Sequence, residues 1–334
     1  MRSFKLALGR SLVFLLAVVC IFEIICWPYF HGEVYDYQDG YVRDSLAGEL
    51  DLLICGASQA KRGISPAVLN EELGCSAYNM GSPLMTMKSR YTLLKKELER
   101  NMVDTVLVEL CYDTMVRDRN VVGMEGDYYM LGRYTSSWER IGFFLSNARL
   151  EEYGDFLYDT LDRGIQSWKR WEGHGTGTSA SYQSRGFVPL QSKAIALPEQ
   201  DQWYQEEILT QIVPENQAYL EKILALCQGK GIRVVMLCTP LADGAILSYD
   251  SLEQIHQFYQ GIADQFGCEY CNFSLYPGKS DIFPDSTAFF DRNHLSTAGA
   301  DTFTRLLCRV LQGQGEAFYE SFDQAQAEIE KRYP

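Results

Sequence analysis

The chain has 334 residues, of which 46% are hydrophobic and 22% are charged, so it is long enough for one large α/β domain or two small ones. Its 44 Asp and Glu outnumber its 30 Lys and Arg, which gives a net charge of −14. Nucleic acids and anionic lipid heads are bound through clustered Lys and Arg. The charge balance therefore argues against a nucleic-acid-binding protein and against peripheral binding to anionic membranes.

The N-terminus has the pattern of a membrane anchor. Residues 1–10 carry three bases and no acid, and residues 11–30 are apolar apart from Ser11 and Glu23. A helix needs roughly 20 residues to span lipid, and this stretch provides them. Because positive charge precedes the span and acidic residues follow it, the pattern predicts a cytoplasmic segment 1–10, a transmembrane anchor 11–30 and an extracytoplasmic domain 31–334.

A cleavable signal peptide is the alternative interpretation of the same stretch. Such a peptide ends in a small-x-small cleavage site, and none followed by a polar start stands out before Trp27. Cys20 lacks the small preceding residue that a lipoprotein site prefers. The uncleaved anchor is favoured, and the expected location is a single-pass membrane protein. Glu23 is costly inside lipid, so it would contact a membrane partner or lie at shallow depth.

Strands and helices alternate after the anchor. The predicted strands are 50–57, 76–80, 103–110, 232–239 and 269–273. The predicted helices are 65–73, 86–101, 215–230, 250–266 and a last one from near 296 to beyond 311, with a solvated helix in the charged tail to 334. Hydrophobic strands that alternate with helices are typical of a parallel sheet covered on both faces. The fold class predicted is α/β, a three-layer α/β/α sandwich with a mostly parallel sheet.

The alternation breaks between about 114 and 213. This stretch is rich in aromatic residues and contains a Gly- and Ser-rich run at 173–186. It is interpreted as an insertion, part helix and part loop, within the domain 31–334. Its role is either surface padding or a lid or partner-docking surface.

The cysteines do not indicate a metal site. Cys55, Cys111 and Cys238 lie in apolar runs predicted as strands, where free cysteines act as small hydrophobic residues. Cys268 and Cys271 form the one C-x-x-C pair. A zinc site needs about four ligands, and residues three apart on a strand point to opposite faces. No metal and no cofactor is predicted.

Two segments carry the residues of a hydrolytic triad. Ser58 follows the first predicted strand in Gly-Ala-Ser, and Asp291 and His294 lie three apart just before the last predicted helix. Sites on parallel sheets form at the carboxyl ends of the strands. A serine hydroxyl needs a base to become a nucleophile, and an imidazole oriented by a carboxylate supplies one. The alternatives are a turn serine and a capping acid beside a surface histidine.

A third segment, 79–81, follows the second predicted strand. Glycine at position 81 lets a backbone N–H approach a developing oxyanion, and the Ser58 N–H would be the second donor. Asn79 either braces this loop or faces the oxyanion. Each motif alone is common in unrelated chains, and Gly81 could be a simple turn residue. Their order along the chain supports the site Ser58, His294 and Asp291 with Gly81 and Asn79 at the oxyanion.

These motifs resemble those of the SGNH/GDSL hydrolase superfamily over most of residues 50–312. Ser58 resembles the nucleophile block, Gly81 the glycine block, and Asp291 with His294 the final block. The resemblance implies an SGNH-type α/β/α sandwich, preceded here by one transmembrane helix. It also implies a serine ester hydrolase or O-acyltransferase.

The anchored form resembles extracytoplasmic members that accompany membrane-bound O-acyltransferases. The D-alanyl-lipoteichoic acid assembly proteins and the alginate-type O-acetylation proteins are such groups. The likeness implies transfer of an acyl group through Ser58 to water or to a hydroxyl of a cell-surface polysaccharide or teichoic-acid-like polymer, with a multi-span O-acyltransferase as partner. Tyr112 stands where the family's oxyanion asparagine belongs, which favours the alternative of a non-catalytic accessory protein. A tethered lipase or thioesterase is a third possibility.

Overall fold

The chain divides into two compact units in the computed structural model. The described residues are 2–31, 50–117, 126, 137–171, 185–193, 195, 199 and 211–333. One unit comprises residues 1–43 and 127–180, and the other comprises residues 44–126 and 181–334. Most of the Gly- and Ser-rich run expected at 173–186 lies outside the described residues.

The second unit, which we call the sheet unit, is built on a parallel sheet of five strands. They are β1 (Leu52–Cys55), β2 (Ala77–Asn79), β3 (Thr105–Glu109), β4 (Arg233–Cys238) and β5 (Glu269–Asn272). Their order across the sheet is β2-β1-β3-β4-β5, and every neighbouring pair is parallel. All five carboxyl ends therefore lie at one edge. Each strand falls within the range predicted for it.

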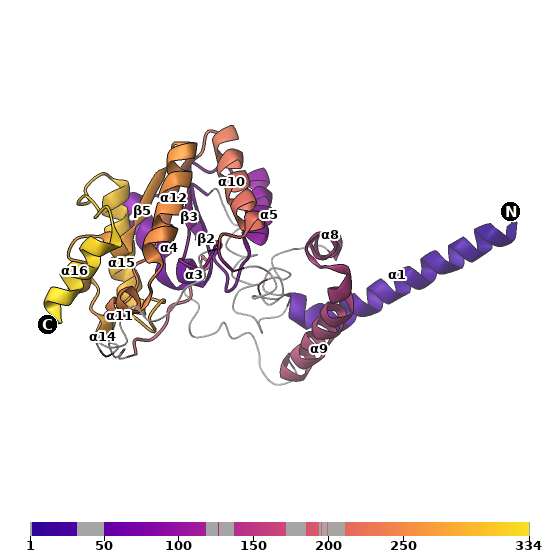
Figure 1. Cartoon of the computed structure of the whole chain (residues 1–334). Coiled ribbons are helices and arrows are strands. Elements are labelled where there is room, and N and C mark those ends of the chain that lie inside the picture. The colour runs from indigo at the N-terminus through magenta and orange to yellow at the C-terminus, as the bar shows by residue number, and fades with distance from the viewer. Residues whose placement is uncertain are drawn as a thin grey trace. The chain divides into compact units, whose positions relative to one another are not determined.

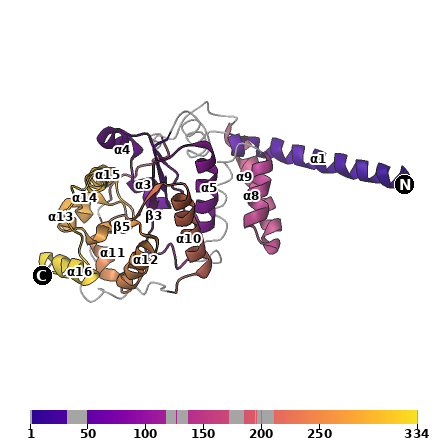
Figure 2. The same cartoon turned by 90° about the horizontal axis from the view of Figure 1, so that it is seen from above.

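Helices cover both faces of this sheet (Figures 1 and 2). The longer ones are α4 (Pro66–Leu73), α5 (Met87–Arg100), α10 (Pro214–Gly229), α12 (Leu252–Phe266) and α15 (Thr297–Leu311). The shorter ones are α3 (Ser58–Gly63), α11 (Asp243–Ser248), α13 (Lys279–Ile282) and α14 (Asp285–Ala288). Helices α4 and α15 pack together on one face, and α5, α10 and α12 cover the other. The predicted three-layer α/β/α sandwich is confirmed.

The period of two along a strand assigns its side chains to the two helical layers. Leu52 and Ile54 of β1 share a buried cluster with Leu307 of α15. Cys55, the residue after Ile54, points the other way, with its thiol beside the Arg90 carbonyl of α5. Cys55 is 1% exposed, as expected for a cysteine that serves as a small hydrophobic residue.

The C-terminal helix α16 (Phe322–Arg332) differs from its prediction as a solvated helix. Phe322, Ala325 and Ile329 are buried in one cluster with Leu247 of α11. Their spacing of i, i+3 and i+7 gives the helix an apolar side despite its charged composition. The prediction of a helix was correct, and the prediction of its exposure was wrong.

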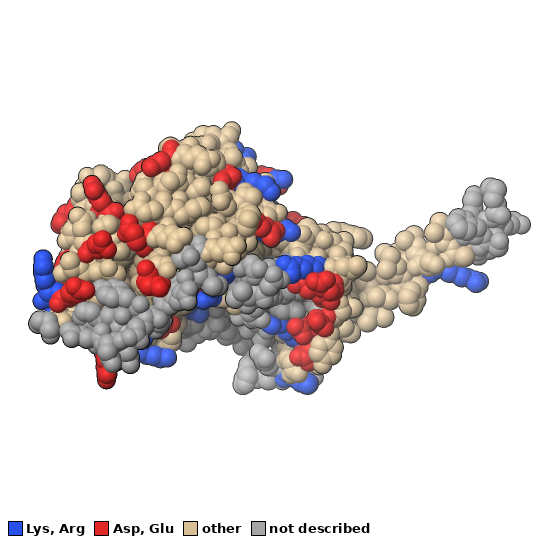
Figure 3. All heavy atoms as spheres, viewed as in Figure 1, with Lys and Arg blue, Asp and Glu red and all other residues tan. Residues whose placement is uncertain are grey.

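The first unit, which we call the α1/α9 unit, contains α1 (Arg2–His31), α8 (Ser137–Asn147), a 3₁₀ turn (Leu150–Glu152) and α9 (Tyr153–Trp171). By length and composition, α1 could cross a membrane over Ala7–Trp27. In Figure 3, acidic side chains are scattered over the sheet unit, whereas α1 is free of them along most of the face in view. Helix α9 packs against α1.

Candidate active site

The turn after β1 presents Ser58 at the carboxyl edge of the sheet. A Cβ on Gly56 would overlap the Ala60 side chain and lie 2.6 Å from Glu109 Oε2, so only glycine fits there. The next residue, Ala57, donates its backbone N–H to Glu109 Oε2 at 2.8 Å. Ser58 then begins α3, above the point where the strand order reverses between β1 and β3. Ligand sites of open α/β sheets form at such a point.

The structure brings together the three residues predicted to form a triad. His294 Nε2 lies 2.8 Å from Ser58 Oγ. On the other side of the ring, His294 Nδ1 lies 2.9 Å from each carboxylate oxygen of Asp291. The imidazole thus connects the hydroxyl to the carboxylate through its two nitrogens, which is the arrangement that nucleophilic catalysis by serine requires.

A short turn fixes the carboxylate relative to the ring. Phe289 and Leu295 pair as an isolated antiparallel bridge on either side of the Asp291–His294 segment. Within the turn, Asp291 Oδ1 accepts the backbone N–H groups of Asn293 and His294, each at 2.8 Å. A spacing of three residues places acid and base together because the acid also closes the turn.

Burial raises the pKa of Asp291, but the hydrogen bonds that its carboxylate accepts lower this pKa by more. The contact with the His294 ring, followed by the N–H groups of Asn293 and His294, holds the pKa of Asp291 below its ordinary value. A carboxylate that stays ionised orients the imidazole and stabilises the imidazolium that forms when the ring accepts a proton.

Helix α15 supports this turn from behind. Ser296 caps the helix by accepting the Gly299 N–H at 3.2 Å, and its own N–H donates to the Ala288 carbonyl at 2.8 Å. A Cβ on Gly299 would overlap that carbonyl oxygen. Glycine therefore lets the first turn of α15 approach Ala288, and His294 is held three residues before the helix begins.

The segment after β2 braces the loop that carries Ser58. Asn79 is fully buried, and its amide group donates to the Ala60 and Ile64 carbonyls at 2.8 Å each. Its Oδ1 accepts the Gly81 N–H at 2.8 Å. Of the two roles considered for Asn79, the structure shows bracing. The Gly81 N–H is engaged by Asn79, so its use as an oxyanion donor stays a prediction.

The backbone N–H of Ser58, the other predicted oxyanion donor, lies in a different environment from that of Gly81. The backbone N–H of Ser58 has no acceptor among the residues that the structure describes. Gly81 approaches the same loop closely, because a Cβ there would lie 2.8 Å from the Lys61 nitrogen and 2.9 Å from the Ala57 carbonyl oxygen. The glycine is required for the packing of this segment against the start of α3.

Glu109 was not singled out from the sequence. It ends β3, is fully buried, and holds the N–H of Ala57, the residue before Ser58. Burial raises the pKa of Glu109, while the charge of Arg90 opposes that rise. The buried Arg90 guanidinium donates to the backbone carbonyl of Glu109 at 2.6 Å. The signal in the sequence that could have identified Glu109 was an acid at the end of an otherwise apolar run, residues 106–110.

Tyr112 contacts the turn that carries His294 rather than Ser58. Its hydroxyl accepts a hydrogen bond from Asn293 Nδ2 at 3.2 Å and lies 3.4 Å from the Tyr249 hydroxyl. Burial and the contact with Tyr249 raise the pKa of Tyr112, which keeps the phenol neutral. Tyr112 thus supports the segment between Asp291 and His294.

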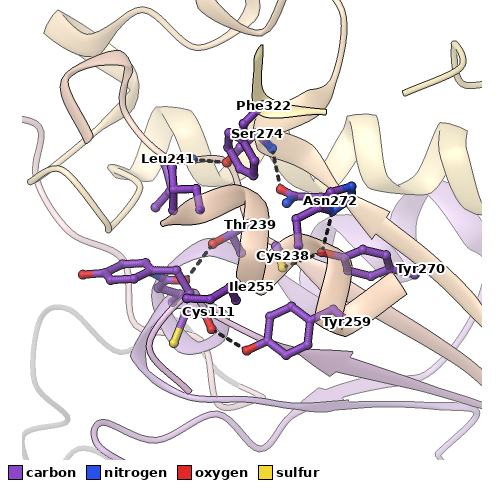
Figure 4. A pocket seen from close by; sticks show the side chains of 14 residues that line it. Cys111, Cys238, Thr239, Leu241, Ile255, Tyr259, Tyr270, Asn272, Ser274 and Phe322 are labelled. Atoms are coloured by element: carbon purple, nitrogen blue, oxygen red, sulfur yellow. Dashed lines mark hydrogen bonds between the residues drawn. The ribbon is translucent and has the colours of Figure 1, made fainter. Parts of the chain in front are cut away.

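A small cavity of about 20 Å³ lies among the carboxyl ends of β3, β4 and β5 and the helix α12 (Figure 4). Its lining includes Gln59, Cys111, Thr239 and His256. Thr239 Oγ1 donates to Gln59 Oε1 at 3.2 Å, which ties the residue after Ser58 to β4. A space of this size holds about one water molecule. It is too small for a sugar or a long acyl chain.

No family model matches the chain, and no curated protein matches it. Similar solved structures include a lipase/acylhydrolase from Enterococcus faecalis, at 12% identity and a TM-score of 0.39 over 80% of this chain and 97% of that one. Another is a GDSL-like lipase from Bacteroides thetaiotaomicron, at 7% identity and a TM-score of 0.40 over 83% of this chain and 98% of that one. At these identities and TM-scores, nothing about the activity of this chain follows from the likeness.

Proposed function

We propose that this chain is a membrane-anchored, serine-dependent acyl-transfer enzyme, either an esterase or an O-acyltransferase. The observation that carries the proposal is the continuous hydrogen-bonded series from Ser58 Oγ through the His294 ring to the Asp291 carboxylate. The three groups come from positions up to 236 residues apart in sequence. Their alignment matches the roles of nucleophile, base and orienting acid.

The reaction follows from this order of groups. Ser58 Oγ attacks the carbonyl carbon of an acyl donor while His294 Nε2 takes the hydroxyl proton. The tetrahedral intermediate collapses, the bond to the leaving group breaks, and that group receives the proton from His294. An acceptor hydroxyl, or water, then gives its proton to His294 and attacks the acyl-Ser58 ester. The bond from the acyl carbon to Ser58 Oγ breaks, the new ester or the free acid leaves, and Ser58 Oγ takes the proton back from His294. Base assistance contributes roughly 10²–10⁴ in rate.

The oxyanion needs donors at the same edge of the sheet. The Ser58 N–H is the first candidate, since it has no acceptor among the described residues. The Gly81 N–H becomes the second if it exchanges its bond to Asn79 Oδ1 for the oxyanion. Each such donor is worth roughly 10²–10³ in rate.

The proposed location follows from α1 and its flanks. Arg2 and Lys5 precede the apolar stretch Ala7–Trp27 and Arg10 lies near its start, which supports a cytoplasmic N-terminus and an extracytoplasmic site. The motif resemblance to anchored SGNH proteins of O-acylation systems supports a hydroxyl of a cell-surface polysaccharide or teichoic-acid-like polymer as acceptor. It also supports a multi-span membrane O-acyltransferase as the partner that supplies the acyl group.

A non-catalytic accessory role is the second candidate. The observation that favours it is the engagement of the Gly81 N–H by Asn79, together with tyrosine at position 112. In that case the sheet unit would keep its fold and bind the acyltransferase or the polymer without forming an acyl-enzyme.

Labelling with a serine-reactive fluorophosphonate tests the proposal. Full-length protein in detergent is treated with the probe, and the label is read by in-gel fluorescence. We expect labelling of the unaltered chain and of Ser251→Ala, a half-buried serine outside the site, and no labelling of Ser58→Ala. Absence of label from the unaltered chain, combined with co-purification of a multi-span partner, would favour the accessory role.

A further inference from the structure

Helix α9 has an apolar side that its own unit leaves exposed. Leu157, Tyr158 and Ile165 are 50%, 72% and 46% exposed. Trp168 continues the same side, and we call these four residues the α9 apolar stripe. Their positions at i, i+1, i+8 and i+11 fall on one flank of an α-helix. Three acids occupy the opposite flank: Asp155, Asp159 and Asp162.

A third side of α9 packs directly on α1. The Cys26 thiol donates to the Thr160 carbonyl at 3.6 Å. A Cβ on Gly164 would lie 2.8 Å from the Ile25 carbonyl oxygen and 3.0 Å from Cys26 Cα. Small residues at positions 160 and 164 of α9 let the two backbones approach closely, as at helix–helix contacts in membranes.

A proline in α1 explains the position of this contact. Proline has no N–H, so Pro28 cannot donate to the Ile24 carbonyl four residues earlier. Trp168 Nε1 donates to that carbonyl at 3.3 Å and to the Ile25 carbonyl at 3.0 Å. A bare carbonyl is costly in an apolar environment, and the indole supplies a partner for it. The contact therefore holds α9 at the C-terminal end of the stretch Ala7–Trp27.

We infer that α9 is an in-plane membrane helix, which lies in the interface of the bilayer that α1 enters. Its apolar stripe is immersed at the boundary of headgroups and acyl chains, and its acidic flank faces water. The inference rests on the proposed insertion of α1. Since α9 contacts α1 at Ile24–Cys26, an inserted α1 places the stripe at the outer boundary of the hydrocarbon.

The composition of the exposed surface favours lipid as its occupant. Tyr and Trp are enriched at membrane interfaces because they combine an apolar ring with a polar group. Trp138 and Leu145 of α8 are also exposed, and α8 joins α9 through the ring contact of Phe144 with Tyr153, with centroids 4.9 Å apart. The net charge of −14 argues against electrostatic attraction to anionic lipid, so burial of apolar side chains is the driving term.

Site-specific photocrosslinking tests the inference. Benzoylphenylalanine replaces Leu157, Tyr158 or Ile165 in the full-length chain, which is reconstituted at low density into phosphatidylcholine vesicles and irradiated. Lipid adducts are quantified by mass spectrometry. Asp155 and Asp162 on the acidic flank are the matched controls, and Phe14 of α1 is the control for insertion. We expect at least about tenfold more lipid adduct at the stripe than at the acidic flank.

The outcomes separate this inference from the anchor itself. Lipid adducts at Phe14 without adducts at the stripe would overturn the in-plane helix and leave the anchor intact. Absence of adducts at Phe14 as well would overturn the anchor, and with it the inference. In cell membranes, adducts from the stripe to a protein instead of lipid would overturn the bilayer as occupant. Far-UV circular dichroism of each variant verifies that α9 has folded.

Discussion

The two units of the chain use apolar side chains in opposite ways. In the sheet unit, Leu53, Val108 and Leu237 are fully buried between the helical layers, and the polar groups of the site are confined to one edge. In the α1/α9 unit, Phe14 and Tyr158 are among many large apolar side chains left exposed. The first pattern is that of a domain stabilised by its own core. The second is expected of a surface that is completed by a membrane.

The largest expected effect concerns the edge of the sheet unit. Ser58→Ala or His294→Gln should lower kcat/KM for a small acyl ester such as p-nitrophenyl acetate by roughly 10³-fold or more, since nucleophile and base act as one unit. Hydrolysis is followed by absorbance with the full-length chain in detergent. Ser251→Ala should retain the activity of the unaltered chain. Turnover that survives in Ser58→Ala would contradict the assignment of the nucleophile.

Asp291→Asn should cost roughly 10²–10⁴ in kcat, because the amide orients the wrong tautomer of His294. The lowered pKa of Asp291 also makes the contribution of its carboxylate to the free energy of unfolding depend on pH. Its contribution is fully present above the ordinary carboxyl value of about 3.9 and is lost as pH falls through the folded value. The melting temperatures of the unaltered chain and of Asp291→Asn should therefore differ by a constant amount above about pH 5 and converge at lower pH. Activity of the variant within twofold of the unaltered chain would contradict this role.

A pair of glycine substitutions compares the units directly. Gly56→Ala should destabilise the sheet unit by about 1–3 kcal/mol and reduce turnover, since the new methyl group meets Glu109 and Ala60. Gly142→Ala in α8 meets nothing within 4 Å and should stabilise that helix by up to about 1 kcal/mol. Thermal unfolding followed by circular dichroism measures both. Equal changes in the free energy of unfolding for the two variants would contradict the close contact of Gly56 with Ala60 and Glu109.

Glu109 provides a pH test of the support under Ser58. Because the pKa of Glu109 is raised in the folded protein, its protonated carboxyl stabilises the fold below the ordinary carboxyl pKa of about 4.3. This stabilisation is lost as pH rises through the pKa of the folded protein. The free energy of unfolding of the unaltered chain, relative to that of Glu109→Gln, should therefore decrease as pH rises. Urea unfolding between pH 4 and pH 8 measures it. A difference that does not change with pH would contradict the raised pKa.

The smallest effect is expected in the α1/α9 unit. Trp168→Phe keeps an aromatic ring but removes the N–H donated to the Ile24 and Ile25 carbonyls, at a cost of about 1 kcal/mol. Protease cleavage of α9 in vesicles should become faster. Trp138→Phe, on the exposed face of α8, is the matched control and should leave the rate unchanged. Equal rates for both variants would show that the indole hydrogen bonds do not hold α9.

The strands and the longer helices of the sheet unit could be predicted because their signals are local. The apolar run 232–239 contains β4, and Ser296 caps α15 where the pattern placed a helix start. The meeting of Asp291 with His294 is also local, since one turn closes both. The approach of Ser58 to His294 was inferred from the rule that sites form at the carboxyl ends of parallel strands.

Other features depend on distant partners that no local pattern specifies. Glu109 looked like one residue of a strand, and its role depends on the Ala57 N–H, 52 positions away. The direction of the Asn79 amide is set by the carbonyls of α3 and the residue after it. Helix α16 was expected to be solvated because its charges outnumber its three buried apolar residues, and its burial depends on α11.

The formation of an acyl-enzyme is the decisive test of Ser58 as the nucleophile. Full-length protein is mixed with a small activated ester, quenched at low pH, digested and mapped by mass spectrometry. We predict one acyl group per chain on the peptide that contains Ser58, formed in an initial burst, and none on the same peptide of Ser58→Ala. An acyl group found only on another residue, or no acyl-enzyme from a folded chain, would contradict the assignment of Ser58.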